Sequence, residues 1–302
     1  MNIEAYAVAW ALAGGAVGTF ALPVLADALL KRKLAGMREW WRRAGGLWRD
    51  LRAADPSCAP DPSARGDEGA AGIWFEEVAR AIQNGTLTKE QAEQARGFGV
   101  VVEDEPDRTD AEDDARYRFA PGAPGRAALA LAMGAAMAGV ALAPVPPVAT
   151  ALLSLAAVLV ALCVVCDVRA HVIPIELCAA LALCGLVLRY VLFGALGAAA
   201  SALAGVFVAL ACAAAIAIFM AVAGRPRAIG AGDVRMMVAL AMLCGPRASI
   251  LGAAACYGTA LTASVALVAA RKKRLSDAVP MAPFLALWAV VGVASGIAGL
   301  SA

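Results

Sequence analysis

The run VATALLSLAAVLVALCVVC, residues 148–166, contains no charged side chain and ends directly at Asp167. A helix needs about 20 mostly apolar residues to cross the hydrocarbon core of a bilayer, so this run predicts a membrane-spanning helix. Similar runs occupy most of the chain. The sequence therefore predicts an all-α, polytopic integral membrane protein with about eight transmembrane helices, at 5–30, 127–143, 148–166, 175–193, 198–223, a short run from 236, 250–270 and 283–300.

Charged residues are concentrated between the first and second predicted helices. Of the 50 charged residues, 34 lie between Lys31 and Arg126. We therefore expect three parts: a first transmembrane helix at 1–30, a cytoplasmic insert at 31–126 and a seven-helix membrane domain at 127–302.

The insert carries helical signals of its own. The apolar spacing over residues 73–82 predicts one helix, and Thr88 with Gln91 forms a capping box that begins a second. The acidic stretch 103–118 is typical of a solvated linker. We expect a small helical hairpin and a linker.

Net charge and cysteine usage exclude several function classes. The net charge of +2 comes without a basic face, so no nucleic-acid partner is expected. Seven of the eight cysteines lie in apolar runs, where thiols behave as small hydrophobic side chains, and no disulfide framework is expected. The N-terminus has no basic segment and does not resemble a cleaved signal peptide.

The distribution of Lys and Arg predicts the orientation, because basic loops face the cytoplasm. If the first helix ends in the cytoplasm, only Arg189 and Arg247 lie toward the outside. Asp167, at the end of the third helix, and Asp233, at the start of the sixth, then share the cytoplasmic side. The basic residues on that side are Lys31, Arg32, Lys33, Arg169, Arg225, Arg227, Arg271, Lys272, Lys273 and Arg274.

Asp167 and Asp233 are the candidate functional residues. A charge at the bilayer centre costs roughly 2.5–3.5 kcal/mol on insertion scales, so acids at membrane depth usually serve function. Two neighbouring carboxyl groups do not both ionise easily. One keeps a proton, and the pair is then equipped to activate water and protonate a leaving group. The alternative is that each carboxyl only caps or solvates a helix end.

The sixth helix is short for a membrane crossing. Between Arg235 and Arg247 there are 11 uncharged residues, about 17 Å of helix against a hydrocarbon core of about 30 Å. We expect the helix to extend past one or both arginines, with Asp233 below the headgroups in a cavity that water enters. The alternative places Asp233 in open cytoplasm.

Three motifs around the two acids resemble the type IV prepilin peptidase family, the bacterial branch of the Gly-x-Gly-Asp intramembrane aspartic proteases. Gly230-Ala-Gly-Asp233 matches the signature, and Asp167 stands seven residues before Pro174, as in the family. Pro280-Met-Ala-Pro283 is similar to the Pro-x-x-Pro segment before the last helix. The resemblance covers residues 148–300. It implies Asp167 and Asp233 as the catalytic pair, with no cofactor.

The resemblance also implies a substrate. Family members cut a short basic leader from prepilins or pseudopilins, after a glycine that precedes the hydrophobic pilin helix. The expected location is the cytoplasmic face of the bacterial inner membrane, with pilus or type II secretion assembly machinery as partner. Bifunctional members carry two Cys-x-x-Cys pairs in the cytoplasmic loop and also methylate the new N-terminus. Here that loop holds only Cys58, so neither a zinc site nor N-methyltransferase activity is expected.

Residues beside the acids have two interpretations each. Gly230 and Gly232 let backbone approach backbone and admit an extended substrate. Pro280 and Pro283 either break a helix beside a wet cavity or simply begin one. Arg169 and Arg235 either bind substrate or lower a carboxyl pKa, or they only anchor the helix ends on the cytoplasmic side. His171 either tunes the pKa of the acid or lies in a surface loop. Cys163 and Cys166 either form a metal or redox pair or pack as small side chains.

Two other functions fit paired acids. A catalytically inactive homologue would act as a scaffold for pilus or secretion assembly. A small proton-coupled transporter would also use two acids, although no inverted repeat relates the halves of the chain.

Overall fold

The structure, a computed structural model, describes residues 3–36, 118–223, 230–270 and 280–298. These residues form helices and the turns between them, with no strand in the described ranges, which confirms the predicted all-α class. The predicted hairpin and linker of the insert, and Cys58, lie outside the described residues. Contacts divide the chain into two compact units, residues Met1–Leu30 with Phe119–Ala302, and residues Lys31–Arg118. All helices described below belong to the first unit, except the last turns of the first helix, residues 31–36.

The first helix runs from Ile3 to Gly36 with one irregular turn. It comprises α1 (Ile3–Ala16), the π-turn η1 (Val17–Ala21), and a continuation in which the Leu22 N–H donates to the carbonyl of Val17. Pro23 explains the irregularity, because proline has no N–H to donate and its ring crowds the carbonyl four residues earlier.

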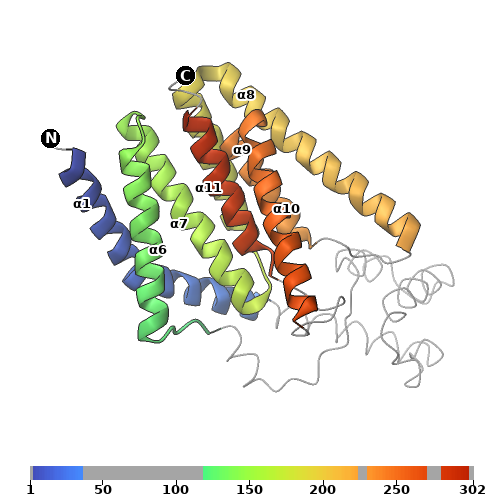
Figure 1. The fold of residues 1–302 in the computed structure, drawn as a ribbon, viewed down its shortest axis with the longest axis horizontal. Coiled ribbons are helices and arrows are strands. Elements are labelled where there is room, and N and C mark those ends of the chain that lie inside the picture. Colours follow the sequence, from blue (N-terminus) through green and yellow to red (C-terminus); the bar gives the residue numbers. More distant parts are fainter. Residues whose placement is uncertain (1–2, 37–117, 224–229, 271–279, 299–302) are drawn as a thin grey trace, which may run out of the picture. The chain divides into compact units, whose positions relative to one another are not determined.

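Helix α6 (Ala123–Leu142) packs along α1, and the two form one side of the unit (Figure 1). Where the chain returns from the insert, the Phe119 N–H donates to Oδ1 of Asp27 at 3.0 Å. A carboxylate of the first helix therefore holds the start of the segment that leads into α6.

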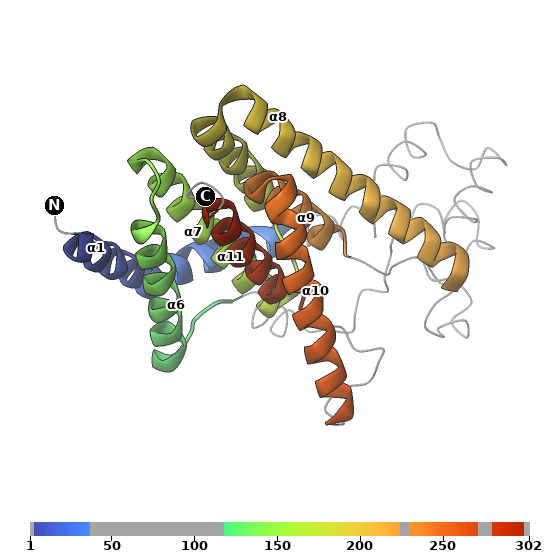
Figure 2. The same cartoon turned by 45° about the horizontal axis from the view of Figure 1, so that its top comes forward.

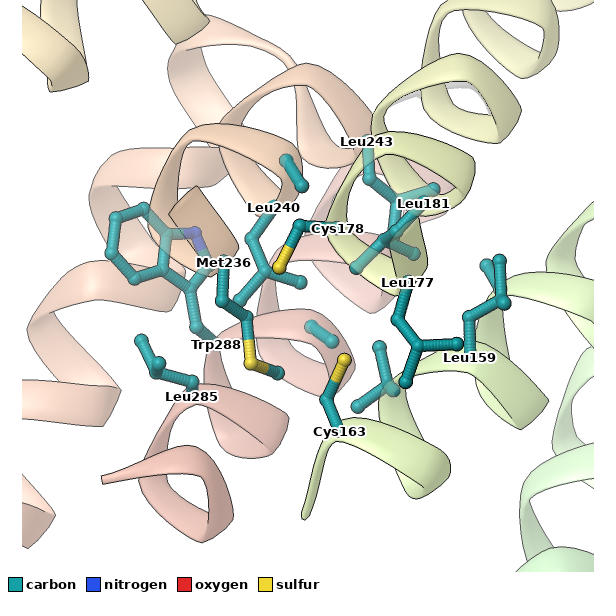
Figure 3. Close-up of a cluster of buried hydrophobic side chains, with 14 of the residues drawn as sticks. Leu159, Cys163, Leu177, Cys178, Leu181, Met236, Leu240, Leu243, Leu285 and Trp288 are labelled. Carbon is teal, nitrogen blue, oxygen red and sulfur yellow. The ribbon is translucent and has the colours of Figure 1, made fainter. Parts of the chain in front are cut away.

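Five further helices surround the predicted site: α7 (Pro147–Ala170), α8 (Ile175–Ala223), α9 (Ala231–Cys244), α10 (Pro246–Ala269) and α11 (Ala282–Ala298). Helix α8 packs against α7 and α9, and α11 packs against α7, α9 and α10. Figure 3 shows the apolar core where these helices meet, with Leu181, Met236, Leu240 and Leu285 fully buried. The core is built from four sequence-distant helices, so it holds α7 and α9 in a defined relation.

Five of the described helices are long and apolar enough to cross a membrane. They are residues Ile3–Gly36, Ala123–Leu142, Pro147–Ala170, Ile175–Ile218 and Pro246–Leu267. Helix α9, with 14 residues, and α11, with 17, fall below that length. The length and apolar composition of these helices therefore indicate a membrane protein.

Helix α8 covers two of the predicted spans. The backbone of Gly194 is not helical, with φ 69° and ψ −164°, and this residue divides α8 into two helices joined at a sharp kink. Only glycine adopts that conformation readily. Beyond the bend the helix first packs on α9, where Gly205 lies beside Met242, and its C-terminal part then extends away from its neighbours (Figures 1 and 2). Leu203, Phe207 and Leu210 on this half are exposed.

The C-terminal end of α9 is buried and held by Arg189 of α8. The Arg189 Nε donates to the carbonyl of Leu243 at 3.0 Å, and its guanidinium carbon lies 5.2 Å from the centre of the Phe193 ring. A cation at a helix C-terminus stabilises the last carbonyls, which have no partner within the helix. The Gly245 N–H also donates to Ala241, at 2.9 Å. This end of α9 is therefore anchored, and the end that carries Asp233 is positioned from it.

Candidate active site

Asp167 lies in the last turn of α7 and is almost fully buried, with 5% of its surface exposed. Helix α7 ends three residues later, at Ala170, because His171 adopts a left-handed conformation with φ 52°; its N–H donates to the Asp167 carbonyl at 2.8 Å. The side chain points into the unit rather than out of it. A buried carboxyl requires a hydrogen-bond partner, since an unpaired one is costly.

That partner comes from the start of α11. The Ala282 N–H donates to Oδ2 of Asp167 at 2.8 Å. The first amides of a helix have no partner within it. In α11, Pro283 has no N–H, and the N–H groups of Phe284 and Leu285 both donate to Met281, at 3.0 and 3.1 Å. The Ala282 amide is the one left over, and Asp167 accepts its hydrogen bond.

Asp233 is the third residue of α9, whose N-cap is Gly230. Its carboxyl group hydrogen-bonds the backbone of Gly230, as an acid at this helix position does when it folds back over the N-terminus. The contact is close: a Cβ added to Gly230 would lie 2.9 Å from Oδ2 of Asp233. Unlike Asp167, Asp233 is only half-buried. One carboxyl is thus enclosed and the other is open to an incoming molecule.

The two acidic motifs meet through Gly232. A Cβ added to Gly232 would lie 3.2 Å from Cβ of Ile173, which belongs to the turn between α7 and α8. The N-terminus of α9 therefore packs on the segment that connects Asp167 to Pro174. The end of α7 that carries Asp167 and the start of α9 that carries Asp233 therefore lie side by side. The structure brings together all three motifs found in the sequence.

The remaining candidates lie around this pair. Pro174 is buried where α8 begins, and Pro280 and Pro283 are half-buried at the start of α11. The side chains of Arg169 and Arg235 are exposed, as is His171. Exposure on the loop side is compatible with both interpretations of the arginines, anchoring and substrate binding.

The cysteines near Asp167 are thiols packed in the core. All seven cysteines that the structure describes are free and buried. Cys163 of α7 and Cys178 of α8 both lie in the apolar core drawn in Figure 3. Within the described ranges, no group of three or more His, Cys, Asp or Glu side chains is arranged to hold a metal ion.

Two contacts of the site, made by Ala282 and Arg189, were not predicted from the sequence. The role of Ala282 is a backbone role, so its side chain gives no signal, although Pro283 beside it removes a competing donor. Arg189 was expected only as an outward-facing basic residue. The local sequence gives no sign that Arg189 is partly buried, and the carbonyl it binds lies 54 residues away.

The fold and the site together define a class: a polytopic helical membrane protein with two acidic side chains brought together at the ends of two helices. Residues 153–297 match the model of the type IV leader peptidase family. This part of the chain, which carries all three motifs, belongs to that family. Neither the curated proteins nor the solved structures include a match to the chain.

Proposed function

We propose that this protein is an aspartic endopeptidase that removes the leader peptide of type IV prepilins or pseudopilins at the cytoplasmic membrane face. The observation that carries the proposal is the convergence of Asp167, Asp233 and Ala282 at one end of α7, α9 and α11. Membership of a leader peptidase family supports the reaction class.

The proposed chemistry uses both carboxyl groups and no cofactor. One carboxyl is ionised and takes a proton from water as the water oxygen attacks the peptide carbonyl. The other is protonated and donates to the carbonyl oxygen. Collapse of the tetrahedral intermediate breaks the C–N bond, and the amine leaves with a proton from a carboxyl group. Neither acid alone supplies both functions.

The enclosure of Asp167 supports this division of work. Its hydrogen bond with Ala282 orients the carboxyl, and its burial excludes bulk water from one side of the pair. Asp233, preceded by a glycine N-cap, is only half-buried, and we propose that the peptide approaches the pair from its side. Positioning of this kind is a large part of enzymatic rate enhancement.

We place the pair slightly below the cytoplasmic headgroups. Helix α9 has 14 residues, or about 21 Å, which is shorter than a hydrocarbon core of about 30 Å. The C-terminal end of α9 is buried and capped by Arg189. We therefore divide the difference between the length of α9 and the thickness of the hydrocarbon core over both ends of the helix. In this arrangement α8 crosses twice, at its two sides of Gly194, and α9 and α11 each cross once, giving the eight crossings expected.

The direct test is incubation of the purified protein with a prepilin from the same genome. Mass spectrometry of the product should find one cut, after the glycine that precedes the hydrophobic pilin helix. A folded, purified protein that leaves several such substrates intact would contradict the proposal and favour the scaffold role.

A further inference from the structure

Tyr257 of α10 directs its hydroxyl at the face of α9 that carries Asp233. The Tyr257 hydroxyl donates to Sδ of Met237 at 2.9 Å. Met237 follows Asp233 by four residues, so the two side chains lie on the same face, one helical turn apart. The hydrogen bond to Met237 therefore places the Tyr257 hydroxyl about one helical turn from Asp233 along α9.

The hydrogen bond to Met237 is a poor one for a phenol. A thioether sulfur is a weak acceptor, whereas tyrosine hydroxyls ordinarily bond oxygen. Membrane interiors supply no water to replace a missing partner. Tyr257 is 47% exposed while Met237 is only 2% exposed, so the tyrosine is accessible from outside the core and the methionine is enclosed.

The corner around Tyr257 is short of acceptors. The Tyr257 and Trp288 rings lie 6.5 Å apart, centre to centre. Trp288, in the core drawn in Figure 3, buries an indole N–H that has no partner among the described residues. The Tyr257 hydroxyl, in contrast to the buried Trp288 N–H, belongs to a partly exposed residue, and it donates to a sulfur atom. A carbonyl oxygen of an extended peptide would be a stronger acceptor for that hydroxyl.

We propose that Tyr257 is a substrate-binding residue whose hydroxyl donates to a main-chain carbonyl of the bound peptide. This inference rests on the proposed peptidase function. Without substrate, the hydroxyl stays on Met237; when peptide binds, it transfers to the better acceptor. No covalent step is involved.

Helix geometry assigns the carbonyl. Met237 follows Asp233 by four residues, which is a rise of about 6 Å along α9. Adjacent residues of an extended peptide are about 3.3 Å apart. Tyr257 therefore reaches a carbonyl about two residues from the cleaved bond. In the proposed orientation, α9 runs from Asp233 toward the membrane interior. The hydrophobic segment of the substrate, which follows the cut, lies in the same direction, so that carbonyl belongs to the mature side of the substrate.

The test compares three proteins by steady-state kinetics on one prepilin. Tyr257→Phe should raise KM by about 3- to 10-fold, the loss of one ordinary hydrogen bond, and leave kcat within about 2-fold. Met237→Leu removes the resting acceptor and keeps the volume, so KM should not rise. Tyr257→Phe should keep its thermal unfolding temperature, because only a weak bond is lost.

A substrate with a backbone ester separates binding from a structural effect. In this substrate, an ester replaces the peptide bond formed by the carbonyl of the second residue after the cut, which makes that carbonyl a weaker acceptor. The ester substrate should have a higher KM than the peptide with the wild-type protein. With Tyr257→Phe, the two substrates should have the same KM. Increases that simply multiply, or an unchanged KM in Tyr257→Phe, would overturn the assignment of Tyr257. A wild-type protein that binds and cuts no prepilin would overturn it as well, by removing the peptidase function first.

Discussion

Replacing Gly230 by alanine should impair the reaction without unfolding the protein. The new Cβ would lie 2.9 Å from Oδ2 of Asp233, whereas ordinary contacts begin at 3.4 Å, so the carboxyl oxygen must retreat by about 0.5 Å. A misplacement of 1 Å in a reacting group costs about 100-fold, so a retreat of half that distance should lower kcat about 10-fold. Gly230 has φ −64° and ψ 138°, which alanine adopts freely, and stability should change by no more than about 0.5 kcal/mol.

Gly122→Ala is the matched control. Gly122 is the N-cap of α6 and has φ −65°, but the nearest atom to its added Cβ is Cδ of Pro124 at 3.8 Å. Its kcat should match the wild type. Both variants are assayed by prepilin cleavage and by thermal unfolding in detergent. An unchanged kcat in Gly230→Ala would refute the placement of the Asp233 carboxyl beside Gly230, or its part in the reaction.

Three further outcomes follow from the same contacts. Arg189→Met should lower the free energy of unfolding by about 1–3 kcal/mol, because the end of α9 loses a charge-assisted hydrogen bond, whereas Met at the exposed Arg247 should change it little; chemical unfolding in detergent measures both. Asp167→Ala should lower the free energy of unfolding by about 1 kcal/mol, because the Ala282 amide of α11 loses its acceptor. Asp167→Asn still accepts that hydrogen bond and should keep the wild-type stability; equal stabilities of the two variants would contradict the role of this bond. With Cys58 the one cysteine of the insert, the purified protein should hold no stoichiometric zinc and transfer no methyl group from S-adenosylmethionine, and an N-methylated pilin in the mass spectrum would contradict this.

Much of the architecture follows from local sequence. Charge-free runs predict helices because a bilayer leaves no alternative for the backbone. The run that ends at Asp167 and the glycines before Asp233 placed both acids at helix ends, where the structure has them. Gly194 was expected to separate two helices, and its non-helical backbone does divide α8 into two helical halves at that point.

Tertiary contacts were beyond local reasoning. The bond from Ala282 to Asp167 joins residues 115 apart and uses a main-chain amide that any residue but proline offers. Tyr257 and Met237 are separated by 20 residues and by a helix reversal, so their pairing depends on how α9 and α10 cross. The charge of Arg189 is visible in the sequence, but the carbonyl it binds is not.

The central claim is that Asp167 and Asp233 act together on a peptide bond. Purified Asp167→Asn and Asp233→Asn should each lose at least about 1,000-fold in kcat on a prepilin, because a lone carboxyl cannot serve as both acid and base. Asp27→Asn is the matched control, since Asp27 also accepts a backbone N–H, from Phe119 at 3.0 Å, and asparagine preserves that bond. Its kcat should equal the wild-type value. Near-normal turnover by either dyad variant, with a folded protein and a normal Asp27→Asn, would contradict the account.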